Sequence, residues 1–215
     1  TTTIGVDASD LNPSNDYIGY PTEVVLFNDA LSPKQVTAVN KTLTKHYGRL
    51  TQGVLNRVTQ CTSPAVKAAY SLRRARATYK GYCVTVKRSQ DAASKSFGFT
   101  KEGVLDTAAI LSFVSTGDGV VTKWFDQSGH DLHLVSIADN EAPFLVKAGV
   151  LVTRHGLPTL DWTATGTKRL FNYAYSPFAS GVTALMAFEF ATMTSAYLLE
   201  QYTNGGDYTG MPAFG

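Results

Sequence analysis

Five acidic residues in the second half of the chain are candidates for acid–base chemistry. They are Asp126, Asp131, Asp161, Glu189 and Glu200. Hydrolysis of a glycoside needs two carboxyl groups at a set separation, about 5–5.5 Å for a retaining enzyme and a wider gap that admits water for an inverting one. No spacing among the five identifies such a pair. The sequence therefore favours a protein without catalytic residues.

Two histidines, His130 and His133, stand three positions apart and raise the question of a metal site. In a strand, residues separated by three positions point to opposite faces, and no third ligand is close in sequence. We therefore interpret both as surface histidines. A serine–histidine–acid triad is compatible with the composition, but no G-x-S-x-G elbow supports one.

The four residues Asp126-Gln127-Ser128-Gly129 follow an aromatic strand and are typical of a structural turn. Asp and Ser side chains in such turns bond nearby backbone N–H groups. We expect Asp126 to accept hydrogen bonds from N–H groups of the turn or its neighbour. On that basis, Asp126→Ala is expected to cost about 1–3 kcal/mol of stability.

Two loops, 12–20 and 201–210, combine tyrosine with Asn, Asp and Gly. A tyrosine ring can contact a sugar ring or a partner protein at small entropic cost, and amide and carboxyl groups can bond hydroxyls. The candidate ligand-binding residues are Tyr17, Tyr20, Tyr202, Asn204, Asp207 and Tyr208. Ordinary solvated loops and subunit contacts are the alternatives.

Calcium is a secondary expectation, because Asp, Asn and backbone oxygens are its usual ligands. Three loops contain such groups: 7–16, 139–141 and 204–207. A polar loop is the favoured interpretation of each. The sequence requires no metal and no other cofactor.

The elements that must position these residues are mostly short strands. Apolar runs and alternation predict strands at 2–6, 23–27, 83–89, 120–127, 131–136, 143–146, 157–162, 182–191 and 196–203. Turn residues separate them. This pattern is typical of an antiparallel β-sandwich.

Three helices are expected beside the strands. The first, 33–47, begins with an S-x-x-Q capping box from Ser32 to Gln35. The second covers 65–78, after the Ser63-Pro64 start signal, and would contain the basic cluster Arg73-Arg74-x-Arg76 as a solvated face. The third begins after Asp106 as N-cap and ends at the Gly-Asp-Gly turn 117–119.

Composition limits the class of protein. The 215 residues, 44% of them hydrophobic and 17% charged, can bury a sizeable core. A net charge of +2 without a long basic stripe disfavours a nucleic-acid partner. No apolar run is long enough to insert into a membrane. Cys61 and Cys83 are the only cysteines. One disulfide between them and two free thiols are both compatible with the sequence.

Four stretches together resemble a known family: 18–48, 69–91, 119–134 and 156–162. They are similar to concanavalin A-like or laminin-G-like jelly-roll sandwiches of bacterial surface proteins and tailed-phage virion proteins. A more distant similarity is to the catalytic domain of fungal arabinofuranosidases. The D-Q-S-G turn and the strand-to-helix stretch at 23–48 are the specific parts. The stretch expected to contain the hydrolases' nucleophilic Glu and adjoining cysteine pair has no match here.

The order of these stretches departs from the family's order, because the strand and helix that end the family's domain come first here. Residues 1–48 are assigned to that terminal strand and helix, 49–62 to a linker, and 63–215 to the main part of the sandwich. One permuted sandwich built from both segments is favoured. A fragment of two tandem sandwiches and a swapped oligomer are the alternatives, and the start at Thr1 favours a piece of a longer chain.

The resemblance implies a function in recognition or structure. It implies a virion or extracellular location, as part of a phage tail, fibre or head decoration with a lectin-like carbohydrate-binding or assembly role. Implied partners are other virion or surface subunits and cell-surface glycans, in an oligomer or a larger chain. A secreted arabinofuranosidase-like hydrolase is the alternative, and a bacterial adhesin is the third possibility.

Overall fold

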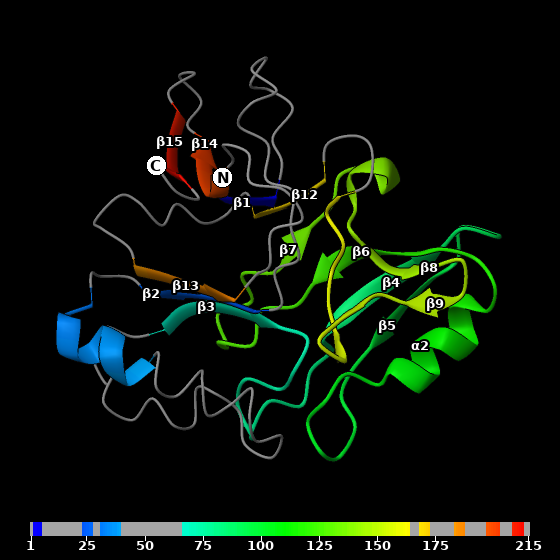
Figure 1. Cartoon of the computed structure of the whole chain (residues 1–215), viewed down its shortest axis with the longest axis horizontal. Coiled ribbons are helices and arrows are strands. Elements are labelled where there is room, and N and C mark those ends of the chain that lie inside the picture. The colour runs from blue at the N-terminus through cyan, green and yellow to red at the C-terminus, as the bar shows by residue number, and fades with distance from the viewer. Residues whose placement is uncertain are drawn as a thin grey trace.

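The computed structural model describes residues 2–5, 23–27, 31–39, 66–163, 168–172, 183–187, 197–202 and 208–212. This part of the chain is mainly β (Figure 1). Its two α-helical stretches are short, namely 33–39 and α2 (Thr107–Val114), and a single 3-10 turn, η3, covers Asp139–Glu141. The described residues contain no helix long and apolar enough to cross a membrane.

The larger sheet has ten strands in the order β15-β14-β1-β12-β7-β6-β4-β5, with β8 on β6 and β9 on β8. Its strands are β1 (Thr2–Gly5), β4 (Val84–Arg88), β5 (Ser94–Phe97), β6 (Gly119–Trp124), β7 (Leu134–Val135), β8 (Phe144–Lys147), β9 (Val150–Leu151), β12 (Arg169–Asn172), β14 (Tyr197–Tyr202) and β15 (Tyr208–Pro212). The pairings within it are antiparallel. The first strand of the chain therefore lies inside the sheet, between β12 and β14.

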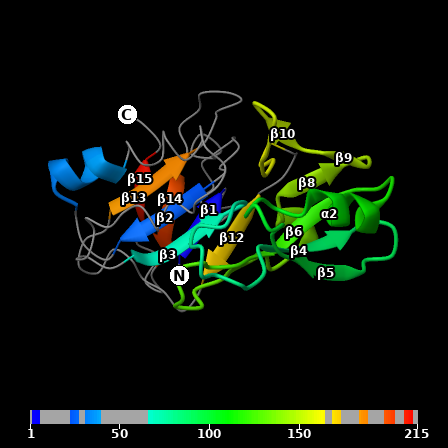
Figure 2. The ribbon, with the colours of Figure 1, turned by 90° about the horizontal axis from the view of Figure 1, so that it is seen from below.

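A second sheet has three antiparallel strands, β13-β2-β3, visible side by side in Figure 2. They are β13 (Thr183–Ala187), β2 (Glu23–Phe27) and β3 (Val66–Ser71). A third, two-stranded sheet pairs β10 (Thr153–Arg154) with β11 (Leu157–Pro158). Strand β2 thus pairs with β13 in this sheet, whereas β6, from the stretch predicted at 120–127, belongs to the larger sheet.

The helix predicted at 65–78 is wrong over its described residues, because Val66–Ser71 forms strand β3. Pairing with β2 and burial of four consecutive side chains, from Ala68 to Ser71, outweigh the helix propensity of the local sequence. The basic cluster is consequently not a solvated helix face. Arg73 is only 8% exposed and forms a β-bridge with Val104, and Arg74 donates to the Thr100 carbonyl at 3.2 Å.

The other two helix predictions agree with the described residues. Asp106 caps α2 by accepting from the Ala109 N–H at 3.1 Å, and Ile110 and Val114 are buried. In the first helix, the Ser32 N–H donates to Gln35 Oε1 at 2.9 Å and the Gln35 N–H donates to Ser32 Oγ at 3.4 Å. Residues 40–47, like the linker 49–62, lie outside the described part.

The core lies between the larger sheet, α2 and strand β3. Its largest fully buried side chains are Trp124, Trp162, Tyr70, Ile110, Leu134, Leu145, Leu160 and Leu170. Cys83 joins this cluster as a free, fully buried thiol whose pKa is raised well above its ordinary value by burial. Of the two alternatives for this cysteine, the structure shows the unpaired thiol.

Candidate functional site

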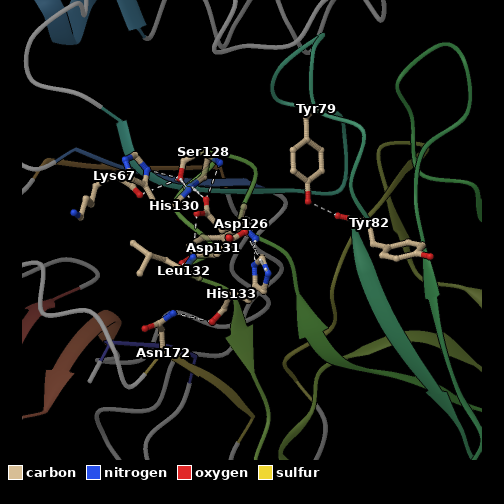
Figure 3. Close-up of polar contacts among 12 residues, drawn as sticks. Lys67, Tyr79, Tyr82, Asp126, Ser128, His130, Asp131, Leu132, His133 and Asn172 are labelled. Atoms are coloured by element: carbon tan, nitrogen blue, oxygen red, sulfur yellow. Dashed lines mark hydrogen bonds and ion pairs between the residues drawn. The ribbon is translucent and has the colours of Figure 1, made fainter.

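The loop that follows β6 contains the D-Q-S-G turn and the two histidines (Figure 3). Gly129 has a φ of +99°, a backbone conformation that only glycine adopts without strain. The chain reverses here and returns as β7. Turn chemistry therefore brings Asp126, Ser128, His130 and His133 into one small volume.

Asp126 is the centre of this loop and is 1% exposed. Its Oδ1 accepts from the Ala69 N–H at 2.9 Å and the Ser128 N–H at 2.8 Å. Its Oδ2 accepts from the Ser128 hydroxyl at 2.6 Å and the Leu132 N–H at 3.2 Å (Figure 3). The expected bonds from backbone N–H groups are present, and they join the turn to β3 in the second sheet.

Gln127 is also 1% exposed, and its side chain bonds backbone groups at the end of β3 and just after it. Its Nε2 donates to the Ser71 carbonyl and its Oε1 accepts from the Ala75 N–H, both at 2.7 Å. Its own N–H donates to the Ala69 carbonyl at 2.7 Å. Both adjacent side chains of the turn thus satisfy backbone groups of a distant segment.

Ser128, His130 and Asp126 contain the residue types of a hydrolytic triad but not its arrangement. In a triad the imidazole stands between the hydroxyl and the carboxyl group. Here the Ser128 hydroxyl bonds Asp126 Oδ2 directly and lies 3.0 Å from both the Lys67 carbonyl and His130 Nδ1. Ser128 is 2% exposed, so its oxygen is shielded from a substrate. The arrangement can hold the backbone but cannot present a nucleophile.

His133 also takes part in the loop's internal bonding. Its Nδ1 accepts from the Asp126 N–H at 3.1 Å, which requires the neutral ring with its proton on Nε2. Burial, and then the positive charge of Lys123, lower the pKa of His133 below its ordinary value. His130 is exposed and contacts Ser128 instead. In the described ranges, no three His, Cys, Asp or Glu side chains form a group that could hold a metal.

We predict that His133 makes the fold less stable in mild acid. Because the pKa of His133 is lower in the folded protein than in the unfolded chain, stability is complete above about pH 6.5 and falls as the pH drops through that value. A protonated His133 can no longer accept the bond from the Asp126 N–H, so the free energy of unfolding should fall by about 0.5–1.5 kcal/mol. Urea unfolding at pH 7.5 and 5.5 measures it.

The matched variant is His133→Asn, which keeps an acceptor near the Nδ1 position and cannot gain a proton. It should lose the part of the pH dependence that His133 contributes. The control is His155→Asn, an exposed position whose φ of +49° asparagine tolerates. An identical pH slope in His133→Asn and the parent protein would show that His133 does not contribute.

An aromatic cluster that the sequence did not indicate borders this loop. The Phe125 ring lies 5.8 Å from the Tyr82 ring and 4.8 Å from the His133 ring, measured between centroids. Tyr82 is 54% exposed, and the Tyr79 hydroxyl donates to its carbonyl at 2.9 Å (Figure 3). Burial, followed by nearby Cys83, raises the pKa of Tyr79 to about 12. Tyr82 lies two residues before β4, where its side chain gives no loop signal.

The acidic candidates do not share one role. Asp161 is buried and bonds Lys147 and Thr163; burial alone would raise its pKa, but these bonds lower it overall. Asp131 is exposed, with Oδ1 3.9 Å from His133 Nε2. Glu200 lies on β14, and Glu189 falls outside the described residues. Asp126 and Asp131 therefore share a loop but differ in burial, whereas Asp161 and Glu200 belong to other segments.

The tyrosine-rich loops are mostly outside the described residues, which include neither Tyr17, Tyr20, Asn204 nor Asp207. Tyr202 and Tyr208 are directly opposite one another on β14 and β15. Of the three calcium candidates, only 139–141 is described. Its Asp139 pairs with Lys87 at 2.5 Å and its Glu141 with Arg169 at 2.9 Å. Both carboxyl groups are therefore engaged in ion pairs rather than placed together as calcium ligands.

The fold and the loop together define a mainly β protein with antiparallel sheets and a buried polar turn that joins two of them. Comparison with protein-family models, with curated proteins and with solved structures finds no match for this chain.

Proposed function

We propose that the chain is a non-catalytic recognition and structural module of a larger assembly, a concanavalin A-like sandwich in a tailed-phage virion protein. One observation carries the proposal. Ser128 and Asp126, which have the residue types of a hydrolytic site, are buried and form hydrogen bonds with each other and with backbone groups of the protein itself. Their arrangement serves a rigid framework, which a recognition module needs.

The jelly-roll assignment and the permuted order belong to this proposal. They are supported by the pairing of early strands with late ones: β1 bonds β12 and β14, and β2 bonds β3 and β13. One sandwich assembled from residues 1–48 and 63–215 accounts for these pairings. The corresponding partners are neighbouring virion or surface subunits and cell-surface glycans, and the location is the virion or the extracellular space.

We predict that the protein does not hydrolyse glycosides and does bind glycans. An aryl arabinofuranoside should release no chromophore above a protein-free blank, because the carboxyl group of Asp126 is bonded to backbone N–H groups and that of Asp161 to Lys147. On a glycan array, the labelled protein should be retained by at least one glycan class. A known arabinofuranosidase serves as the positive control.

Two results would contradict the proposal. One is turnover above the blank that falls in Asp161→Asn or Glu200→Gln, which would indicate the hydrolase alternative. The other is an array without retention together with a protein that neither self-associates nor binds a neighbouring subunit.

A further inference from the structure

A hollow of about 300 Å³ opens over β4, β6 and β8, away from the D-Q-S-G turn. Its lining residues are Lys87, Arg88, Ser89, Ala92, Asp118, Val120, Asp139, Asn140 and Phe144. Pockets for small ligands begin at about this volume. The hollow can therefore accept a molecule of roughly one sugar ring.

The floor of the hollow is a row of three residues from three adjacent strands. Lys87 on β4 is opposite Val120 on β6, and Val120 is opposite Phe144 on β8. Directly opposed residues in antiparallel strands point to the same face of a sheet. The row thus presents an ammonium group, a β-branched side chain and an aromatic ring in sequence.

One wall is held by backbone and side-chain hydrogen bonds between two turns. The Ser89 N–H donates to the Asp118 carbonyl and the Asp118 N–H donates to Ser89 Oγ, both at 2.9 Å. Asp118 Oδ1 accepts from the Ala148 N–H at 2.8 Å. Arg88 bonds Asp91 at 2.6–2.8 Å and the Phe113 carbonyl at 2.8 Å. This wall is therefore formed before a ligand arrives.

The opposite wall is the 3-10 turn η3. The buried ammonium of Lys168 donates to the Asn140 carbonyl at 2.8 Å and lies 4.6 Å from the centre of the Phe144 ring. Glu141 is held by Arg169 through bonds of 2.9 and 3.1 Å. These contacts keep the exposed side chains of Asp139 and Asn140 at the mouth of the hollow.

The charges of the lining residues balance, while Lys168, outside the lining, donates to the Asn140 carbonyl. Two cations, Lys87 and Arg88, stand with two acids, Asp118 and Asp139. Lys87 and Asp139 neutralise one another at 2.5 Å, and Arg88 is paired with Asp91 outside the lining. A charged ligand would disturb these pairs, whereas a neutral ligand with hydroxyl groups can bond both partners of each.

We propose that this hollow binds one residue of a neutral saccharide. The C–H face of the sugar contacts Val120 and Phe144, and its hydroxyls bond Lys87, Asp139 and Asn140. This inference rests on the proposed recognition function and assigns it a site. That site is distinct from the tyrosine-rich loops indicated by the sequence and from the aromatic cluster at Tyr82.

The test is saturation-transfer NMR with the full chain and a panel of neutral methyl glycosides at about 10 mM, followed by titration of the best binder. We expect a Kd of about 1 mM, the ordinary range for a weak single-residue ligand. Asn140→Ala and Asp139→Asn should each raise the Kd about tenfold. Val120→Tyr, which fills the hollow, should abolish binding. Thermal melts confirm that the variants are folded.

Two controls separate this site from other surfaces. Lys101→Ala removes an exposed lysine outside the hollow, and Tyr82→Ala removes the exposed ring of the aromatic cluster. Neither should change the Kd. If Tyr82→Ala weakens binding and the three hollow variants do not, the site is wrong while the recognition function stands. Binding of no glycoside in the panel would also overturn the inference, and the array and turnover experiments would still decide the function.

Discussion

Replacement of Asp126 by alanine is expected to lower the free energy of unfolding by about 3–5 kcal/mol. The side chain accepts three backbone N–H bonds and one hydroxyl bond, all within a region that excludes water. Alanine would leave the three N–H groups without this acceptor, whereas the Ser128 hydroxyl could still donate to the Lys67 carbonyl. The expected loss exceeds the value anticipated for an isolated turn, because one of the bonds reaches Ala69 in another sheet.

Urea denaturation monitored by tryptophan fluorescence gives the unfolding free energy, because Trp124 in the neighbouring strand is fully buried. Asp131→Asn is the matched control: its side chain lies in the same loop but is 91% exposed, and asparagine tolerates the φ of +57° at this position, so a change below about 0.5 kcal/mol is expected. A different outcome would refute the structural role. If Asp126→Ala unfolds like the parent protein yet loses glycan binding, Asp126 belongs to a binding site.

Replacement of Gln127 by glutamate is expected to cost about 2–4 kcal/mol at pH 7. The size of the side chain is unchanged, and one oxygen can still accept from the Ala75 N–H. The other oxygen, however, replaces the amide that donates to the Ser71 carbonyl, so an acceptor faces an acceptor in a buried site. Burial and this contact should raise the pKa of the introduced carboxyl group above its unfolded value of about 4.3.

The sign of the pH effect follows from that shift. The cost is largest above the raised pKa, where folding must bury the charged form, and it shrinks as the pH falls toward about 4. Unfolding at pH 7 and pH 4.5 therefore distinguishes the two protonation states. Gln90→Glu is the control, because Gln90 also donates to a carbonyl, that of Val114, but from an exposed position. Equal costs in the two variants would mean that burial of Gln127 is not what makes its amide necessary.

Elements that depend on short-range interactions were predictable from the residues alone. Asp106 caps α2 because the bonded N–H, at Ala109, is three positions further along the chain. Asp126 bonds the N–H of Ser128 for the same reason, since an aspartate reaches two positions ahead in a turn. Strands β4 and β6 fall within the runs expected at 83–89 and 120–127, apart from Gly119 at the edge. In the two aspartate contacts neighbouring residues supply both partners, and each of the two strands is marked by a local run of apolar residues.

Long-range pairing determined the rest. Segment 66–71 contains good helix formers, whose preferences differ by less than about 1 kcal/mol per residue, so the ladder to β2 and the bonds from Asp126 and Gln127 outweigh them. Ala69 and Asp126 are 57 residues apart, and no spacing rule connects them. The floor of the hollow could not be predicted from the sequence either, because Lys87, Val120 and Phe144 become neighbours only through the register of three strands. Hydrophobic alternation indicates that a strand exists, whereas its partners depend on which surfaces the folded chain can bury together.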